Sequence, residues 1–190
     1  MVIIGDSSAL TCLARIRQLE ILNKLYRQVI VPKEVYYEIA QKKSNETKYL
    51  LNYLSDKVWK YNIINEIINP KFNSDKGEYD CINLCLTIEN HEEIKDDYKL
   101  LIDDKMGRKI AQKNDISVIG SIGVLRASIR KGILNNYNEI NKIIQNLSNE
   151  IDNNNLRIPK ELMIKELTQA MKIKNIEKDT VSFSSTRRLR

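Results

Sequence analysis

The first eight residues, MVIIGDSS, constrain the fold more than any other stretch of the chain. They hold four consecutive apolar residues followed by Gly5, and such a run is typical of a strand that is buried on both faces of a parallel sheet. Asp6 then follows the carboxyl end of the strand, which is where open α/β sheets bind their ligands. Ser7 or Ser8 is expected to cap the next helix, and Asp6 can share that role. The sequence therefore leaves Asp6 open to a capping role or to a functional one.

Four more short apolar runs follow, and helix-like segments separate them. We expect further strands in Gln28–Val31, Val58–Ile64, Lys99–Ile102 and Ile116–Ile119. The spacing of apolar residues predicts two short helices in Ala9–Leu25 and single helices in Lys33–Lys43, Glu46–Leu54, Gly77–Ile88, Lys105–Asn114, Ser121–Lys131 and Asn138–Leu147. Strands that alternate with helices, joined by right-handed crossovers, predict a three-layer α/β fold with a parallel five-stranded sheet flanked by helices.

The length and charge of the chain indicate one main domain with an appendage. A chain of 190 residues, 42% of them hydrophobic, can bury a full core. We expect the domain over residues 1–150, a C-terminal helix over residues 156–175 and a disordered basic tail over residues 176–190. From Arg157 to Arg190 there are nine Lys or Arg and four Asp or Glu. This basic end suits an acidic partner such as RNA, DNA or an acidic protein, although a merely solvated tail carries the same charge.

The cysteines and the histidine argue against several kinds of site. Three widely spread cysteines give no disulfide framework, which favours a reducing cytosol. Cys81 and Cys85 lack a second Cys or His pair for a zinc site, and His91 is the only histidine of the chain. No run approaches the ~20 apolar residues that cross a bilayer. We therefore expect a cytoplasmic protein without a membrane span or a catalytic histidine.

Carboxylates recur at comparable places along the chain. Two adjacent aspartates end the apolar run Lys99–Ile102, and charges about 4 Å apart cost roughly 4 kcal/mol at an effective dielectric near 20 unless a cation offsets them. Acidic residues on helices are more often solvated or placed to favour the helix dipole. The sequence nevertheless predicts an acidic pocket that suits Mg²⁺ or Mn²⁺ rather than zinc. Its candidate residues are Asp6, Glu38, Asp80, Asp103 and Asp104.

Five segments, in this order, resemble the PIN-domain nucleases, and especially the PIN-like toxins of bacterial toxin–antitoxin pairs: GDSSALTCLARI, VIVPKEVYYEI, GEYDCINLCL, LLIDDKMGRKIA and VIGSIGVLRASIRKGI. LRIPKELMIKELTQAMK is similar to the closing helix of that group. The resemblance places the four acidic positions of the family on Asp6, on Glu38 with Glu34 as a less favoured substitute, on Asp80 with Glu78 beside it, and on the pair Asp103 and Asp104. It does not decide which member of the pair binds the metal. The family's hydroxyl falls on Ser7 or Ser8, and Ser8 is our candidate.

The resemblance implies a Mg²⁺- or Mn²⁺-dependent endoribonuclease that is the toxin of a type II toxin–antitoxin pair. It further implies an RNA substrate, a cognate antitoxin protein and a homodimer. Lys105 and Arg108, next to the acidic pair, are candidates for contacts with substrate phosphates, although charges on a helix surface are more often only solvated. The alternative is a catalytically silent PIN-like protein with a binding or regulatory role.

Overall fold

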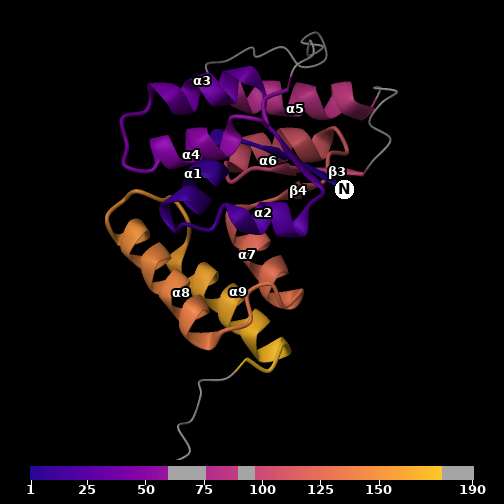
Figure 1. Cartoon of the computed structure of the whole chain (residues 1–190). Coiled ribbons are helices and arrows are strands. Elements are labelled where there is room, and N and C mark those ends of the chain that lie inside the picture. Colours follow the sequence, from indigo (N-terminus) through magenta and orange to yellow (C-terminus); the bar gives the residue numbers. More distant parts are fainter. Residues whose placement is uncertain (60–75, 90–96, 177–190) are drawn as a thin grey trace, which may run out of the picture.

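The computed structural model describes residues 1–59, 76–89 and 97–176 of the chain (Figure 1). The described strands are β1 (Val2–Gly5), β2 (Gln28–Ile30), β3 (Tyr98–Leu101) and β4 (Val118–Ile119). The described helices are α1 (Ser7–Arg15), α2 (Glu20–Leu25), α3 (Lys33–Gln41), α4 (Thr47–Leu54), α5 (Lys76–Glu89), α6 (Lys105–Lys113), α7 (Ser121–Arg130), α8 (Tyr137–Asp152) and α9 (Lys160–Ile173).

The four described strands form one parallel sheet in the order β2-β1-β3-β4. The chain runs from β1 to β2 on one side and then crosses to β3 on the other side of β1. The strand order therefore reverses between β1 and β3, and open α/β sheets bind ligands beyond the carboxyl ends of the strands at such a switch point. The parallel α/β sheet flanked by helices that the sequence predicted is thus confirmed.

The described part of the chain holds four of the five strands expected. Within Val58–Ile64, residues 60–64 lie outside the described part of the chain, and Val58 forms an isolated parallel bridge with Val31. Two backbone hydrogen bonds flank this bridge: the N–H of Val31 donates to Lys57 and the N–H of Trp59 donates to Val31. Pro32, the next residue after Val31, has no N–H to donate to a ladder.

The helices cover both sides of the sheet. In Figure 1, α3 and α5 lie together at the top, while α2, α7 and the α8–α9 pair lie toward the bottom. All four residues of β1 are buried, as a central strand of a parallel sheet requires. From α9, Met163 and Leu167 are buried and belong to the same hydrophobic core as the sheet. The closing helix expected from the sequence thus packs on the main body of the protein.

Two helix starts correct or refine the expectations from the sequence. Asp6, and neither Ser7 nor Ser8, is the N-cap of α1, and Asp104 is the N-cap of α6. Helix α8 extends to Asp152, five residues beyond the expected end at Leu147.

None of the described helices is long and apolar enough to cross a membrane. The expected disordered tail, apart from Ile176, lies outside the described residues.

Candidate functional site

The switch point brings Asp6 and Asp103 to neighbouring positions. Gly5 pairs with Leu101 in the register of β1 and β3, and the N–H of Asp6 donates to the carbonyl of Leu101 at 3.0 Å. Asp6 therefore leaves the sheet beside β3, and Asp103 leaves it two residues after the paired position. Both aspartates stand at the carboxyl edge where the sequence placed them.

Asp6 is buried, with 2% of its surface exposed. Its Oδ2 accepts hydrogen bonds from the backbone N–H of Ser8, at 3.0 Å, and from the Ser8 hydroxyl. Burial raises the pKa of Asp6, the bonds from Ser8 lower it in part, and the charge of Glu38 raises it further. On balance, the surroundings of Asp6 therefore disfavour its charged form.

Glu38 on α3 faces the start of α1. Its Oε1 accepts hydrogen bonds from the Ser7 hydroxyl, at 2.8 Å, and from Lys42 Nζ, at 2.6 Å. Ser7 and Ser8 thus hold different carboxylates, Glu38 and Asp6 respectively. The hydroxyl groups of both serines after Asp6 therefore donate to candidate carboxylates.

The two adjacent aspartates do different things. Asp103 Oδ1 accepts a hydrogen bond from the N–H of Ser121, at 2.8 Å, in the first turn of α7. Burial raises the pKa of Asp103, while Ser121 and Arg108 lower it in part. Asp104 Oδ1 instead accepts from the N–H groups of Met106 and Gly107, at 2.6 and 2.7 Å. Each of the two neighbouring carboxylates is therefore stabilised by its own donors.

An open cleft of about 600 Å³ adjoins these acids. Ser8, Asp103 and Asp104 line it together with Glu78 from the start of α5. Glu78 reaches α6, because a Cβ added to Gly107 would come within 3.1 Å of its Oε2. Glu78, which the sequence suggested only as a neighbour of Asp80, thus lies at the cleft.

Asp80 is placed differently from the other acidic candidates. It is buried in α5, and it is not among the described residues that line the cleft. Burial and the charge of Glu34 raise the pKa of Asp80 to about 6, although Lys76 lowers it in part. Its Oδ2 has no hydrogen-bond partner among the described residues. The structure therefore pairs Asp80 with Glu34 rather than with Asp6.

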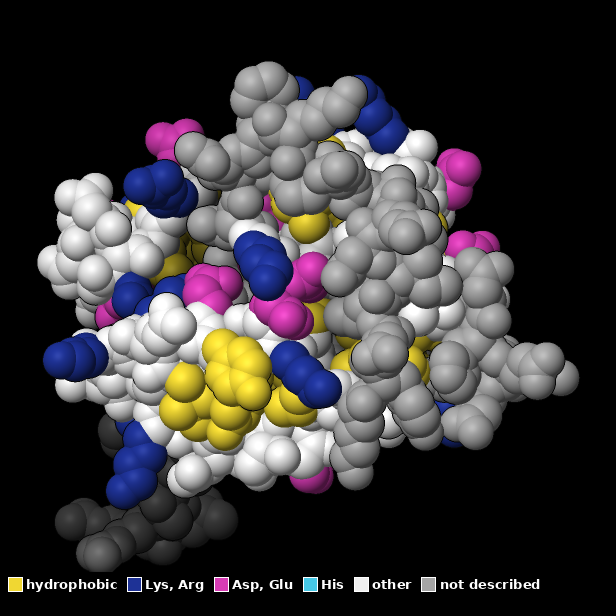
Figure 2. Space-filling view, turned by 90° about the horizontal axis from the view of Figure 1, so that it is seen from above, with side chains coloured by type: hydrophobic (Ala, Val, Ile, Leu, Met, Phe, Trp, Pro, Cys, Tyr) yellow, Lys and Arg dark blue, Asp and Glu magenta, His cyan; other side chains and the backbone are white. Residues whose placement is uncertain are grey.

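A second opening lies between α3 and α5. It has a volume of about 400 Å³ and is lined by Glu34, Tyr37 and Glu38 of α3 and by Lys76 and Gly77 of α5. Figure 2 views the protein from this side, and acidic side chains lie there beside lysine and arginine side chains and a hydrophobic group. Glu34 and Glu38, one helical turn apart, face the two different acidic neighbours Asp80 and Asp6.

The carboxylate oxygens are the kind of ligand that a hard cation prefers, but the described side chains do not point to one common position. Across residues 1–59, 76–89 and 97–176, no three Asp, Glu, His or Cys side chains are grouped closely enough to hold a metal ion. Among the described residues the buried Oδ2 of Asp80 has no hydrogen-bond partner, and burial raises the pKa values of Asp6 and Asp103 more than their partners lower them. Oxygen donors of this kind fit Mg²⁺ or Mn²⁺.

Several basic residues at the cleft were not anticipated from the sequence. Lys42 lies four residues after Glu38, a helical spacing that would have revealed it. Arg15 and Arg157 also line the cleft, but they are far apart in the chain and carry no local pattern. Of the two anticipated substrate contacts, Lys105 lines the cleft, and Arg108 lies near Asp103.

One of the comparisons with known proteins found a family match for most of the chain. A family model described as PIN domain matches residues 2–172. The match includes all the strands of the described sheet, the acidic residues at its carboxyl edge and nearly all of α9. No curated protein and no solved structure is significantly similar to the chain.

Proposed function

Because the chain belongs to the PIN-domain family, whose members are generally nucleases, we propose that it is a metal-dependent endoribonuclease acting at the cleft. The observation that carries the proposal is the placement of Asp6 and Asp103 at the switch point of the sheet. Both carboxylates are held by hydrogen bonds at the edge where this class of sheet binds ligands, and both have raised pKa values.

Asp6, Glu38 and Asp103 are the residues best placed to hold Mg²⁺ or Mn²⁺. Asp80 and Asp104 complete the proposed acidic set, and Glu78 is an added candidate from the cleft wall. When bound, such an ion supplies an activated water and neutralises charge on the scissile phosphate. The ion also offsets the burial of Asp6 and Asp103, which the protein alone compensates only in part.

The chain's own residues orient the acids and the substrate. Ser8 fixes the carboxylate of Asp6, and Ser7 with Lys42 fixes that of Glu38. Lys105 is exposed at the cleft, where its ammonium group can attract a phosphate of the RNA backbone. Ser7, Ser8 and Lys42 thus orient the carboxylates that would hold the ion, and Lys105 would bind the RNA backbone.

The finer proposal is that the protein is the toxin of a type II toxin–antitoxin pair. Its support is the likeness of the five quoted segments to PIN-like toxins. A cognate antitoxin protein and a homodimer are proposed on the same ground. The neighbouring reading frame tests this directly, since a small antitoxin-like gene there favours the toxin role.

The alternative is a PIN-like protein that binds without cleaving. The observation in its favour is that existing partners already occupy the acids: Lys42 binds Glu38, and two backbone N–H groups bind Asp104. A binding role requires no convergence of the carboxylates on an ion.

Cleavage of RNA by the wild type and by Asp6→Asn, with Mg²⁺ or Mn²⁺, decides between the two. Asn caps a helix as well as Asp does and removes a buried charge, so the variant should melt at the same temperature or higher. Its cleavage rate should nonetheless fall by orders of magnitude, because each tenfold loss corresponds to only about 1.4 kcal/mol at the barrier. Asp56→Asn, at an exposed position after α4, is the matched control. Equal cleavage by two folded proteins would rule out a catalytic Asp6, and an inactive wild type would favour the binding role.

A further inference from the structure

A further hollow, distinct from the opening between α3 and α5, adjoins the cleft on the side of the C-terminal helices. This groove has a volume of about 320 Å³ and lies between β4, α7 and α9. The cleft and the groove share three lining residues: Asp103, Arg157 and Ile158. A strand of nucleic acid that leaves the cleft past Asp103 therefore has a path into the groove, with Arg157 at the junction.

Among the described residues, Arg157 has no hydrogen-bond or ion-pair partner, which distinguishes it from Arg15 and Arg126. Arg15 binds Glu46 at 2.7 Å and Glu150 at 3.2 Å, and Arg126 binds Glu166 at 2.5 Å. Arg108 lies beside Asp103, whose pKa it lowers. Arg157 is exposed and forms no hydrogen bond or ion pair with any residue that the structure describes. Its guanidinium group is thus free to take an anion from outside the protein.

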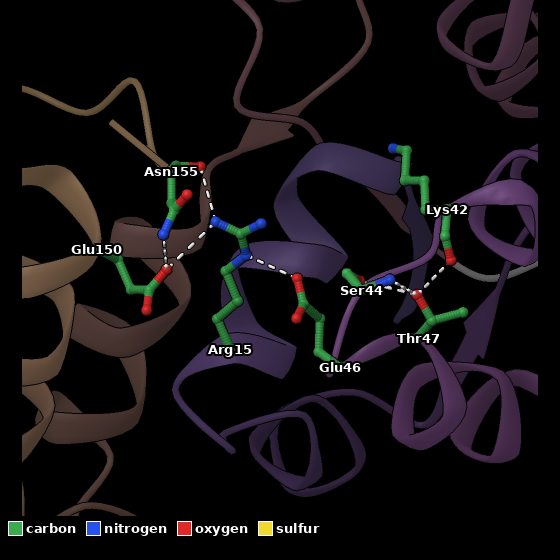
Figure 3. Close-up of polar contacts among 7 residues, drawn as sticks. All are labelled: Arg15, Lys42, Ser44, Glu46, Thr47, Glu150 and Asn155. Atoms are coloured by element: carbon green, nitrogen blue, oxygen red, sulfur yellow. Dashed lines mark hydrogen bonds and ion pairs between the residues drawn. The ribbon is translucent and has the colours of Figure 1, made fainter. Parts of the chain in front are cut away.

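The loop that carries Arg157 is held in place by Arg15 (Figure 3). Arg15 extends from the last turn of α1, and its Nη1 donates to the carbonyl of Asn155 at 3.0 Å. The side chain of Asn155 in turn donates to Glu150 Oε2, at 3.0 Å, and that oxygen also accepts from Arg15. Glu46 binds Nε of Arg15 from the start of α4. Arg15 therefore ties the α8–α9 connection to two helices of the main body, two residues before Arg157.

We propose that Arg157 is a substrate-binding residue that holds a phosphate of single-stranded RNA at the junction of the cleft and the groove, and that Arg15 is the positioning residue that places it. The guanidinium fork binds phosphate with two hydrogen bonds, which a point charge cannot do. Leu162 lines the groove and is 52% exposed, so it offers apolar surface to a base next to that phosphate. The proposal rests on the proposed ribonuclease function and names where its substrate leaves the cleft.

The first test measures binding without cleavage. A short fluorescein-labelled single-stranded RNA is titrated with protein in EDTA at several KCl concentrations. Arg157→Gln should weaken binding roughly tenfold, as expected for loss of a charged hydrogen bond, and should reduce the salt slope by about 0.7. Arg130→Gln removes the same charge from an exposed position at the end of α7, outside both hollows, and should leave affinity and slope close to the wild type.

The second test separates positioning from charge. Glu150 lines neither hollow, and Glu150→Ala removes one hydrogen bond of Arg15 and the bond of the Asn155 side chain, together with a negative charge. Simple electrostatics predicts tighter RNA binding for this variant, whereas loss of positioning predicts weaker binding and a reduced salt slope. Glu139→Ala, on the same helix, removes the same charge without touching Arg15 and should not weaken binding. In the Arg157→Gln background, Glu150→Ala should have little further effect, because both changes act on one contact.

The outcomes distinguish this proposal from the nuclease function. If the wild type cleaves RNA and Arg157→Gln binds and cleaves like it, the role of Arg157 is overturned while the function stands. If no cleavage occurs but Arg157→Gln still weakens RNA binding and lowers the slope, the site stands and the nuclease function fails. Tighter binding by Glu150→Ala would overturn the positioning role of Arg15. Binding of poly-glutamate as tight as that of RNA, and equally dependent on Arg157, would overturn the assignment of the site to RNA.

Discussion

Asp103 Oδ1 accepts a hydrogen bond from the backbone N–H of Ser121 at 2.8 Å, and this bond ties the second residue after β3 to the first turn of α7. The N-terminus of a helix favours an anion, because its first N–H groups lack partners within the helix. The bond therefore favours the charged carboxylate at a place where burial favours the neutral acid. The position of Asp103 depends on how closely the chain before α7 approaches it.

Gly120 allows that approach, and Gly120→Ala should disturb the site. An added Cβ would lie 2.7 Å from Asp103 Oδ1 and 3.0 Å from Arg108 Nη1. We expect the carboxylate to move and cleavage to fall at least tenfold, since a displacement of about 1 Å in a catalytic group can cost about a hundredfold. RNA cleavage and thermal melting of the variant measure the two effects.

Gly123→Ala is the matched control for this change. Gly123 lies in the first turn of α7, of which Gly120 is the N-cap, and a methyl group there would come 2.8 Å from Cγ1 of Ile119, so the change disturbs an apolar contact instead of an acid. We expect it to lower the melting temperature with cleavage per folded molecule largely retained. Equal losses of cleavage in both variants would mean that Gly120 acts through packing alone.

Asp80 should make the stability of the protein depend on pH. Burial and Glu34 raise its pKa from 3.8 to about 6, so the folded protein binds the proton more tightly than the unfolded chain does. Stability should therefore fall as the pH rises between these two values, by at most about 2 kcal/mol. Asp80→Asn should flatten this part of the pH profile and raise the melting temperature at neutral pH.

Asp152→Asn, at an exposed position at the end of α8, is the control for the change at Asp80. It should leave the slope of stability between pH 3.8 and about 6 unchanged. Urea unfolding at several pH values gives the free energies. A profile of Asp80→Asn that parallels the wild type would show that Asp80 does not carry this dependence.

The fold was largely predictable because its elements leave local patterns. The apolar run before Gly5 predicted β1, and the helical spacing of apolar residues predicted α3, α5 and α9. Most of the expected strand Val58–Ile64, residues 60–64, lies outside the described part of the chain. Of the described part of that segment, Val58 forms a parallel bridge with Val31.

The site was less predictable because its geometry depends on contacts between distant segments. The sequence indicated that Asp6 and Asp103 follow strands, and the parallel register of β1 and β3 brings them to one edge. It did not show that Asp80 faces Glu34, because this depends on how α5 packs against α3. Arg157 was missed for the same reason: it comes to the cleft through contacts that Arg15 makes some 140 residues away.

Deletion of residues 177–190 should weaken binding of nucleic acid through charge alone. Three arginines, at positions 187, 188 and 190, lie in this segment, which is outside the described residues. Each cation that contacts a single strand adds about 0.7 to the salt slope, so the deletion should flatten the slope and leave the melting temperature unchanged. Titrations of labelled RNA at several KCl concentrations test this. An unchanged slope would identify the segment as a solvated terminus.

Mg²⁺ or Mn²⁺ should stabilise the folded protein, because the ion offsets carboxylates that burial leaves short of positive charge. An ion that binds the folded state alone, at 100 times its dissociation constant, adds about 2.7 kcal/mol, which raises the melting temperature of a chain of this size by about 5 to 10 °C. The double variant Asp6→Asn/Asp103→Asn should show a higher melting temperature without metal and a much smaller rise with it. Scanning calorimetry with MnCl₂, and with NaCl at the same ionic strength, separates binding of the ion from screening. A rise of equal size in the wild type and the double variant would place the ion elsewhere, and no rise in the wild type would contradict a metal site at the carboxyl edge of the sheet.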